Sequence, residues 1–141
     1  MKLHRGRLID HLHLVVTDLE KSRRFYSAVL EVFGLKVVPY GEHAFGCDEL
    51  FISDEAFTRG NATAPHRVHL AFQAPDHETV ARFHRAALAA GGRDNGGPGE
   101  RPYHPGYYGA FVLDPDGNNI EAVHHGPHHR SAPSVEIEFD G

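Results

Sequence analysis

The sequence contains very little cysteine and lysine, and each shortage excludes a class of protein. Cys47 is the only cysteine among 141 residues, so the chain cannot form an internal disulfide and suits the reducing cytoplasm. Lysine occurs only at Lys2, Lys21 and Lys36, no basic run is present, and the formal net charge is −5. We therefore do not expect a nucleic-acid partner, because such proteins neutralise phosphates with clustered cations.

Long apolar runs are also missing. The longest spans a few residues, which is too short for a transmembrane helix. Residues 1–16 lack the apolar segment and the small-residue cleavage site of a secretory signal. Hydrophobic residues make up 40% of the chain and charged residues 23%, which is typical of a globular protein. These features predict one cytoplasmic domain over residues 1–141, with no membrane partner.

An internal repeat runs through the chain with an offset of 58 residues. Residues 11–34 align without a gap to residues 69–92, and both segments open with a histidine, His11 or His69. Any two strand-helix units share leucines and alanines. That general similarity does not explain two histidines at the same phase, so we interpret the repeat as a duplication.

Each repeat begins with a strand and a helix. Alternating polarity predicts a strand over residues 8–16. Thr17 and Glu20 have the spacing of a capping box, which predicts the start of a helix, and Gly34 is a typical helix end. The second repeat shows the same pattern from His69 onward.

Short strands follow each helix, so the predicted unit is β-α-β-β-β taken twice, an α+β fold. The first repeat covers about residues 8–53, residues 54–66 form a linker, and the second repeat covers about residues 67–125. The tail, 126–141, contains an alternating segment that predicts an extra edge strand. The strands expected after the helices lie at 35–40, 42–46, 49–53, 92–95, 108–113 and 118–124.

Three side chains on different predicted strands point to metal chemistry. His11 and His69 are repeat partners, and Glu121 lies between the apolar residues Ile120 and Ala122. A carboxylate among apolar neighbours is costly to bury unless it is paired or binds a cation. Two histidines and one carboxylate suit a divalent metal and leave positions open for substrate. Most other histidines are read as ordinary core or surface residues.

Two further groups of histidines are treated separately. His13 shares a strand face with His11 and is either a support for the metal site or a substrate contact. The cluster of His124, His125, His128 and His129 is interpreted as mostly exposed and not catalytic, with only His125 on the face of Glu121.

Taken together, residues 8–124 resemble the vicinal oxygen chelate superfamily. The resemblance is carried by DHLHLVVTDLEKSRRFY, HLAF and LDPDGNNIEAV. This superfamily includes glyoxalases, bleomycin-resistance proteins and extradiol dioxygenases. The segment HPGYYGAFVLDPDGN resembles a subgroup of uncharacterised glyoxalase-like bacterial proteins.

The resemblance implies a fold, a metal site and an assembly. Two βαβββ modules would form a cupped mixed sheet, with His11, His69 and Glu121 as ligands of one divalent ion: Fe, Ni, Zn or Mn. Short members of the family share the cup between two subunits, so a homodimer with sites at the interface is implied. The metal would stabilise charge that develops on two neighbouring substrate oxygens.

Glyoxalase I has a second glutamate ligand from the first repeat, and this sequence departs from that pattern. The nearest candidate is Glu49, which is otherwise a solvated edge-strand residue. His13 or Glu49 is the candidate for moving a proton.

The glycine- and proline-rich loop at 94–107 is either a lid over the site or a plain surface loop. Arg101 and Arg130 are either anion contacts or ordinary surface residues. The candidate walls of a substrate pocket, which are otherwise residues packed at the sheet edge, are Tyr103, His104, Tyr107 and Tyr108.

The leading hypothesis is a metal-dependent lyase, isomerase or dioxygenase that acts on a small molecule with adjacent oxygens. The alternative is a bleomycin-resistance-like protein that sequesters a small molecule without catalysis. A third reading is a subunit kept only for interaction. The fold alone does not select among these functions.

Overall fold

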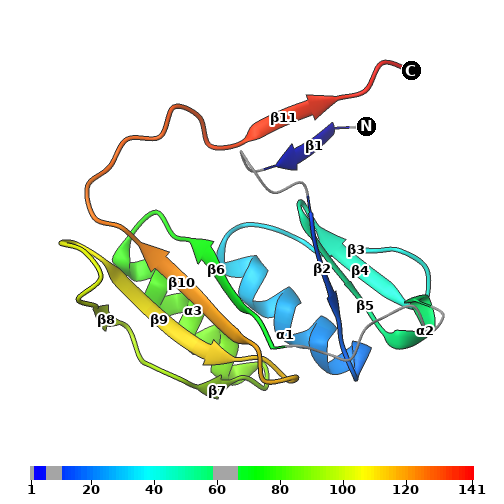
Figure 1. Cartoon of the computed structure of the whole chain (residues 1–141), viewed down its shortest axis with the longest axis horizontal. Coiled ribbons are helices and arrows are strands. Elements are labelled where there is room, and N and C mark those ends of the chain that lie inside the picture. The colour runs from blue at the N-terminus through cyan, green and yellow to red at the C-terminus, as the bar shows by residue number, and fades with distance from the viewer. Residues whose placement is uncertain (1, 6–10, 59–66) are drawn as a thin grey trace.

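The computed structural model describes residues 2–5, 11–58 and 67–141, with backbone alone for 2–5. The predicted strand positions 8–10 and the linker positions 59–66 lie outside the described residues. The described residues form three helices and eleven strands arranged in three sheets (Figure 1).

The first module has the predicted β-α-β-β-β order. Its first strand, β2, pairs in parallel with its last strand, β5, and the sheet order is β2-β5-β4-β3. The elements are β2 (Leu12–Val15), α1 (Leu19–Val32), β3 (Val38–Pro39), β4 (Ala44–Cys47) and β5 (Leu50–Ser53).

The second module repeats this topology strand for strand. Its sheet order is β6-β10-β9-β7, and its first strand again runs parallel to its last. A short extra strand, β8 (Gly99–Glu100), pairs with β9 inside the predicted loop. The predicted fold of two βαβββ modules is therefore confirmed. The elements are β6 (His69–Gln73), α3 (His77–Ala89), β7 (Arg93–Asp94), β9 (Tyr108–Leu113) and β10 (Asn119–His124).

The predicted capping box at the start of α1 is wrong. The N-cap is Asp18, whose carboxylate accepts a hydrogen bond from the Lys21 backbone N–H. Thr17 instead donates its hydroxyl and its backbone N–H to Asp116 in the β9–β10 turn. A long-range contact has taken the side chain that local spacing assigned to the helix.

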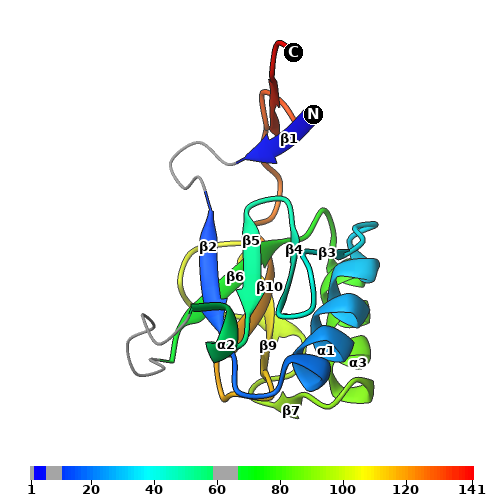
Figure 2. The ribbon, with the colours of Figure 1, turned by 90° about the vertical axis from the view of Figure 1, so that its right-hand side faces the viewer.

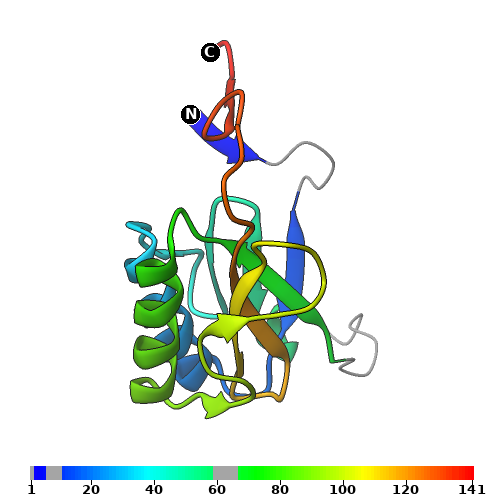
Figure 3. The ribbon, with the colours of Figure 1, turned by 90° about the vertical axis from the view of Figure 1, so that its left-hand side faces the viewer.

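The linker and the tail also differ from the prediction. The linker contains a short helix, α2 (Glu55–Thr58). The tail strand β11 (Val135–Glu138) does not extend a module sheet. It pairs with β1 (Lys2–Arg5), which the sequence did not predict, in a separate two-stranded ribbon. Figures 2 and 3 show this ribbon standing apart from both modules.

The two modules lie side by side, with both main helices in one layer and both sheets in the other (Figures 2 and 3). Apolar residues at helical spacing turn inward from α1 and α3, and one face of each sheet covers them. None of the described helices is long and apolar enough to cross a membrane. The fully buried residues of the helices include Phe25, Tyr26, Val29, Val80, Phe83 and Ala87.

Candidate metal centre

The sheet face turned away from the helices is the polar face of the second module. Along β6, His69, Ala71 and Gln73 are exposed, whereas Leu70 and Phe72 are half-buried against the core. This alternation follows from the strand period of two residues. Because β10 pairs with β6 in register, Glu121 lies opposite Ala71 on the same face.

His69 and Glu121 come together on this face as the sequence predicted for two of the three ligands. His69 Nε2 lies 2.8 Å from Glu121 Oε1. The Glu121 side chain is 1% exposed and that of His69 is 54% exposed. A carboxylate is thus held at the bottom of the face, with an imidazole between it and solvent.

Tyr107 holds the other oxygen of the carboxylate. Its hydroxyl donates to Glu121 Oε2, and burial followed by this hydrogen bond raises the pKa of Tyr107 above its usual value. Gly109 leaves room for the arrangement, because a Cβ at that position would lie 3.0 Å from Glu121 Oε2. Sequence reasoning placed Tyr107 in the substrate pocket and did not identify it as the partner of Glu121.

Two histidines extend this network behind Tyr107. His104 Nε2 lies 2.8 Å from His125 Nδ1, and both rings meet the Tyr107 ring edge-on at centroid distances of 5.3 Å. Burial, and then the neighbouring His104, lowers the pKa of His125. The predicted placement of His125 on the Glu121 side of the strand agrees with these contacts.

The remaining predicted pocket residues are divided between two faces. Tyr103 lies 4.9 Å from Tyr107, ring centroid to ring centroid, and is 65% exposed. Tyr108 points to the helix side and stacks on His77 at 3.8 Å, so the structure does not bring it to the other three. His77 also contacts His124, again on the helix side.

Both candidate arginines hydrogen-bond to backbone carbonyls. Arg101 donates to the oxygen of Gly97 and lies 5.3 Å from the Phe111 ring centroid. Arg130 donates to the oxygen of Pro133. These bonds tie each guanidinium to its own loop, which fits the surface reading of both residues.

The first module carries the other predicted ligand, His11, on the equivalent open face. His13 lies on this face too, with its Nε2 2.7 Å from Ser53 Oγ. Burial, and then the charge of His11, lowers the pKa of His13. A cavity of about 320 Å³ is lined by His11, His13, Tyr40, Asp48, Leu50 and Phe51.

Strand register shows which residue of the first module corresponds to Glu121. Glu121 pairs with Ala71, and Ala71 is the repeat partner of His13. His13 pairs with Phe51, so Phe51 occupies the equivalent position. Glu49 lies two residues earlier, in the turn between β4 and β5. The first module therefore offers no carboxylate at the position that Glu121 holds in the second.

An aromatic cluster on the first module was not predicted. Its four rings come from four different elements or loops, and Phe51 lies 4.9 Å from His13, 5.5 Å from Tyr40 and 5.2 Å from Phe57 by ring centroids. Tyr40 is 51% exposed and Phe57 45%. Their wide separation in sequence leaves no periodic signal. We call His13, Tyr40, Phe51 and Phe57 the aromatic cluster.

Within one chain, the side chains that come together supply only part of what a divalent metal site needs. His69 and Glu121 provide an imidazole and a carboxylate, the donor types that zinc, iron, nickel and manganese accept. Over residues 11–58 and 67–141, no three His, Cys, Asp or Glu side chains converge on one point. His11, the third predicted ligand, lies just before β2 in the first module and is not grouped with the pair.

The chain is built from two βαβββ modules, each with a polar open face. This architecture places it in one class of small proteins. A family model described as the Glyoxalase/Bleomycin resistance protein/Dioxygenase superfamily matches residues 8–122. The chain belongs to this superfamily, which confirms the resemblance seen in the sequence. No protein with a curated description matches the chain.

Solved structures with the same fold include several members of this superfamily. A glyoxalase/bleomycin resistance protein from Albidiferax ferrireducens T118 is 29% identical, with a TM-score of 0.72, and the match covers 84% of this chain and 99% of that one. A lactoylglutathione lyase from Agrobacterium tumefaciens is 21% identical, with a TM-score of 0.59 and coverage of 84% and 94%. TioX from Micromonospora sp. ML1 is 18% identical, with a TM-score of 0.59 and coverage of 81% and 95%.

Proposed function

We propose that this protein is a metal-dependent enzyme of the glyoxalase or dioxygenase type, acting on a small molecule with adjacent oxygen atoms. The observation that carries the proposal is the pair formed by buried Glu121 and exposed His69 on an open sheet face. A buried carboxylate needs a cation or hydrogen-bond donors, and this one faces the side from which a ligand can approach. Membership of the superfamily supports the same reading.

The third ligand is His11 from a second copy of the chain. Both open sheet faces lie on the same side of the molecule, opposite the helices (Figure 2). Two copies facing each other about a two-fold axis would place the first module of one against the second module of the other. A homodimer then has two equivalent sites, each with two histidines and one glutamate.

A divalent ion bound there would supply a Lewis acid for developing negative charge on substrate oxygens. The chain itself would bind the substrate, exclude water and move protons. His13 and Glu49 line the first-module face and turn, and remain our candidates for proton transfer. The hydrogen bond to Ser53 holds the His13 ring in place. We place the protein in the cytoplasm, where Cys47 would stay reduced.

Metal content per subunit tests the proposal. The tag-free protein should bind about one equivalent of Fe, Ni, Zn or Mn after reconstitution, as expected for one closed three-ligand set. Glu121→Gln should lose that metal, whereas Glu100→Gln, which removes an exposed carboxylate from β8, should keep it. The histidine-rich tail can bind metal on its own, so both variants are compared in a chain ending after His125. Equal metal content in the two variants would overturn the proposal.

The aromatic cluster supports a second candidate function, sequestration of a small molecule without turnover. Exposed Tyr40 and Phe57 beside a cavity of about 320 Å³ offer a surface on which a planar ligand could stack. This reading predicts that ligand binding is independent of metal. A chelated sample that binds ligand as tightly as the metal-loaded one would favour sequestration over catalysis.

A further inference from the structure

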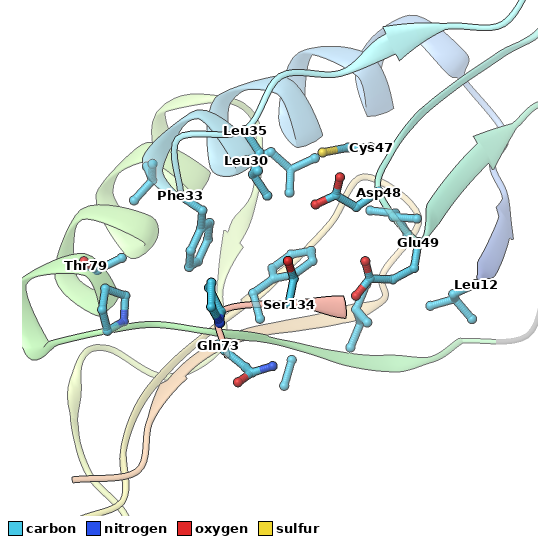
Figure 4. A pocket seen from close by; sticks show the side chains of 17 residues that line it. Leu12, Leu30, Phe33, Leu35, Cys47, Asp48, Glu49, Gln73, Thr79 and Ser134 are labelled. Atoms are coloured by element: carbon cyan, nitrogen blue, oxygen red, sulfur yellow. The ribbon is translucent and has the colours of Figure 1, made fainter. Parts of the chain in front are cut away.

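A sizeable cavity lies between the two modules, apart from the His69–Glu121 pair. Its volume is about 590 Å³, within the range of small-molecule sites. Most of its walls are apolar side chains from α1, β5 and β6, and Pro133 and Ser134 of the tail close one side (Figure 4). The apolar wall includes Leu12, Leu30, Phe33, Leu35, Leu70 and Phe72.

Two carboxylates point into this cavity from one tight turn. Asp48 and Glu49 form the two-residue connection between β4 and β5, and Figure 4 shows both side chains directed toward the open space. Asp48 adopts a positive φ of 49°, a left-handed conformation that aspartate tolerates better than most non-glycine residues and that suits a tight turn. Within the described residues, neither side chain has a hydrogen bond or an ion pair.

The cavity has no cation of its own to balance these charges. Its lining contains no lysine, arginine or histidine among the residues that the structure describes. The effect on the nearby thiol agrees with this: burial, and then Asp48 and Glu49, raises the pKa of Cys47 to about 11. Asp48 is exposed and Glu49 is half-buried, so the two carboxylates border the apolar space from its solvent side. This arrangement favours a ligand that is hydrophobic at one end and positively charged at the other.

We propose that the cavity between the modules binds a small apolar amine, with its ammonium group at Asp48 and Glu49 and its hydrocarbon part against Phe33, Leu70 and Phe72. The cavity is separate from the His69–Glu121 pair, because neither residue lines it, but Asp48 also borders the cavity of His11 and His13. Glu49 is also one of our two candidates for proton transfer, so an amine bound here would compete with that role. The cavity is thus a second binding site that shares the Asp48–Glu49 turn with the first-module face.

Three probes of equal size and different charge test the proposal on the full-length chain. They are 1-naphthylmethylamine, 1-naphthalenemethanol and 1-naphthoic acid, which present a cation, a neutral group and an anion on the same ring system. Calorimetry should show the amine binding about tenfold tighter than the alcohol, with the acid weakest, from attraction to two nearby carboxylates. Methyl NMR shifts should map the amine to Leu30, Leu35 and Leu70.

Variants that remove two negative charges inside or outside the cavity separate binding at the site from the effect of the protein's net charge. Asp48→Asn with Glu49→Gln should reduce the preference for amine over alcohol to about twofold or less. Glu31→Gln with Glu42→Gln changes the net charge equally, outside the cavity, and should keep the tenfold preference. Glu121→Gln should also keep it, whether or not that variant binds metal.

Three results would overturn the proposal. One is equal affinity for the amine and the acid, and another is methyl shifts outside the cavity. The third is a cavity filled by a second copy of the chain, which would appear as concentration-dependent shifts of the same methyl groups without any probe, together with failure of the amine to bind.

Discussion

At Glu121 the environment of a single side chain distinguishes the second module from the first. One oxygen accepts from His69 and the other from Tyr107, and Gly109 leaves the space that both bonds need. In the first module Phe51 takes the equivalent place and packs with aromatic neighbours instead. The same backbone position therefore holds a buried, hydrogen-bonded carboxylate in one module and an apolar contact in the other.

Replacing Tyr107 tests whether it orients the carboxylate. Tyr107→Phe removes the hydroxyl that holds Glu121 Oε2, so we expect metal affinity to fall about 10- to 100-fold, as for other residues that hold a ligand in place. Competition with a coloured chelator measures this without any assay of activity. Tyr103→Phe is the matched control, since its ring contacts Tyr107 but is mostly exposed. Equal affinities in both variants would remove Tyr107 from the metal centre.

The pair of His43 and Asp54 makes stability depend on pH in a defined window. The hydrogen bond between Nδ1 and Oδ2, 2.8 Å long, raises the pKa of His43 and lowers that of Asp54. The histidine contribution is complete below pH about 6.5 and disappears as pH rises through the folded pKa. The aspartate contribution exists above pH about 3.9 and disappears as pH falls through its folded pKa.

His43→Ala should therefore lower the urea midpoint most between about pH 4 and 6.5, and less at pH 8 and above. The effect should be small because the pair is exposed. His129→Ala removes another exposed histidine and should show no such window. A constant difference at every pH would contradict the prediction.

The β9–β10 turn shows how one element connects the two modules. Asp114 is 2% exposed and accepts bonds from the backbone N–H groups of Asp116 and Asn118 and from the Asn118 side chain. Tyr26 of α1, in the other module, donates its hydroxyl to Asp114 at 2.5 Å. Burial, and then the charge of Asp114, raises the pKa of Tyr26 well above its usual value. The turn is thus also an anchor for the first helix.

Two substitutions test how much stability comes from the Tyr26–Asp114 bond and how much from the bonds that Asp114 accepts within the turn. Tyr26→Phe removes one donor to a charged group, and we expect a loss of about 1.5–3 kcal/mol in unfolding free energy. Asp114→Ala leaves several buried donors without an acceptor and should cost about 3 kcal/mol or more. Urea unfolding followed by circular dichroism measures both.

Ser22 provides a control on the same helix. Its hydroxyl is buried and, among the described residues, has no hydrogen-bond partner. Ser22→Ala should therefore be neutral or slightly stabilising. If Ser22→Ala lowered the unfolding free energy as much as Tyr26→Phe, the loss would reflect sensitivity of α1 to any change. It would then not be evidence for the Tyr26–Asp114 bond.

At the scale of the whole molecule, the separation of His11 from the His69–Glu121 pair is the main constraint. Within its described residues one chain does not bring the three proposed ligands together, but the two modules share one topology and open to the same side. A dimer would complete the set twice. Val135 of the β1–β11 ribbon and Phe139 directly after it are about half exposed.

Mixing two defective chains tests the shared site. His11→Ala alone and Glu121→Ala alone should each lose tight metal binding. After unfolding and refolding together in equal amounts, about a quarter of the metal content should return, because half of the dimers are mixed and each has one intact site. If all ligands came from one chain, or if the chain stayed monomeric, mixing would restore nothing.

The sequence by itself determined the main elements of the two modules and their order. Helical and alternating spacing is local, so it revealed the two βαβββ repeats, the α+β class and the last two module strands to within a residue. The chemistry of His69 and Glu121 was also visible, because a carboxylate amid apolar strand residues is unusual wherever the strand lies. That His11, His69 and Glu121 bind a metal remains a prediction.

Only the tertiary structure decided how these elements meet. Strand register placed Phe51 opposite His13, a bond to Asp116 in the β9–β10 turn took Thr17 away from its predicted cap, and β1 paired with the tail. Tyr107 became the partner of Glu121, and a cavity opened between the modules. These features depend on contacts between residues far apart in the chain, which local periodicity does not encode.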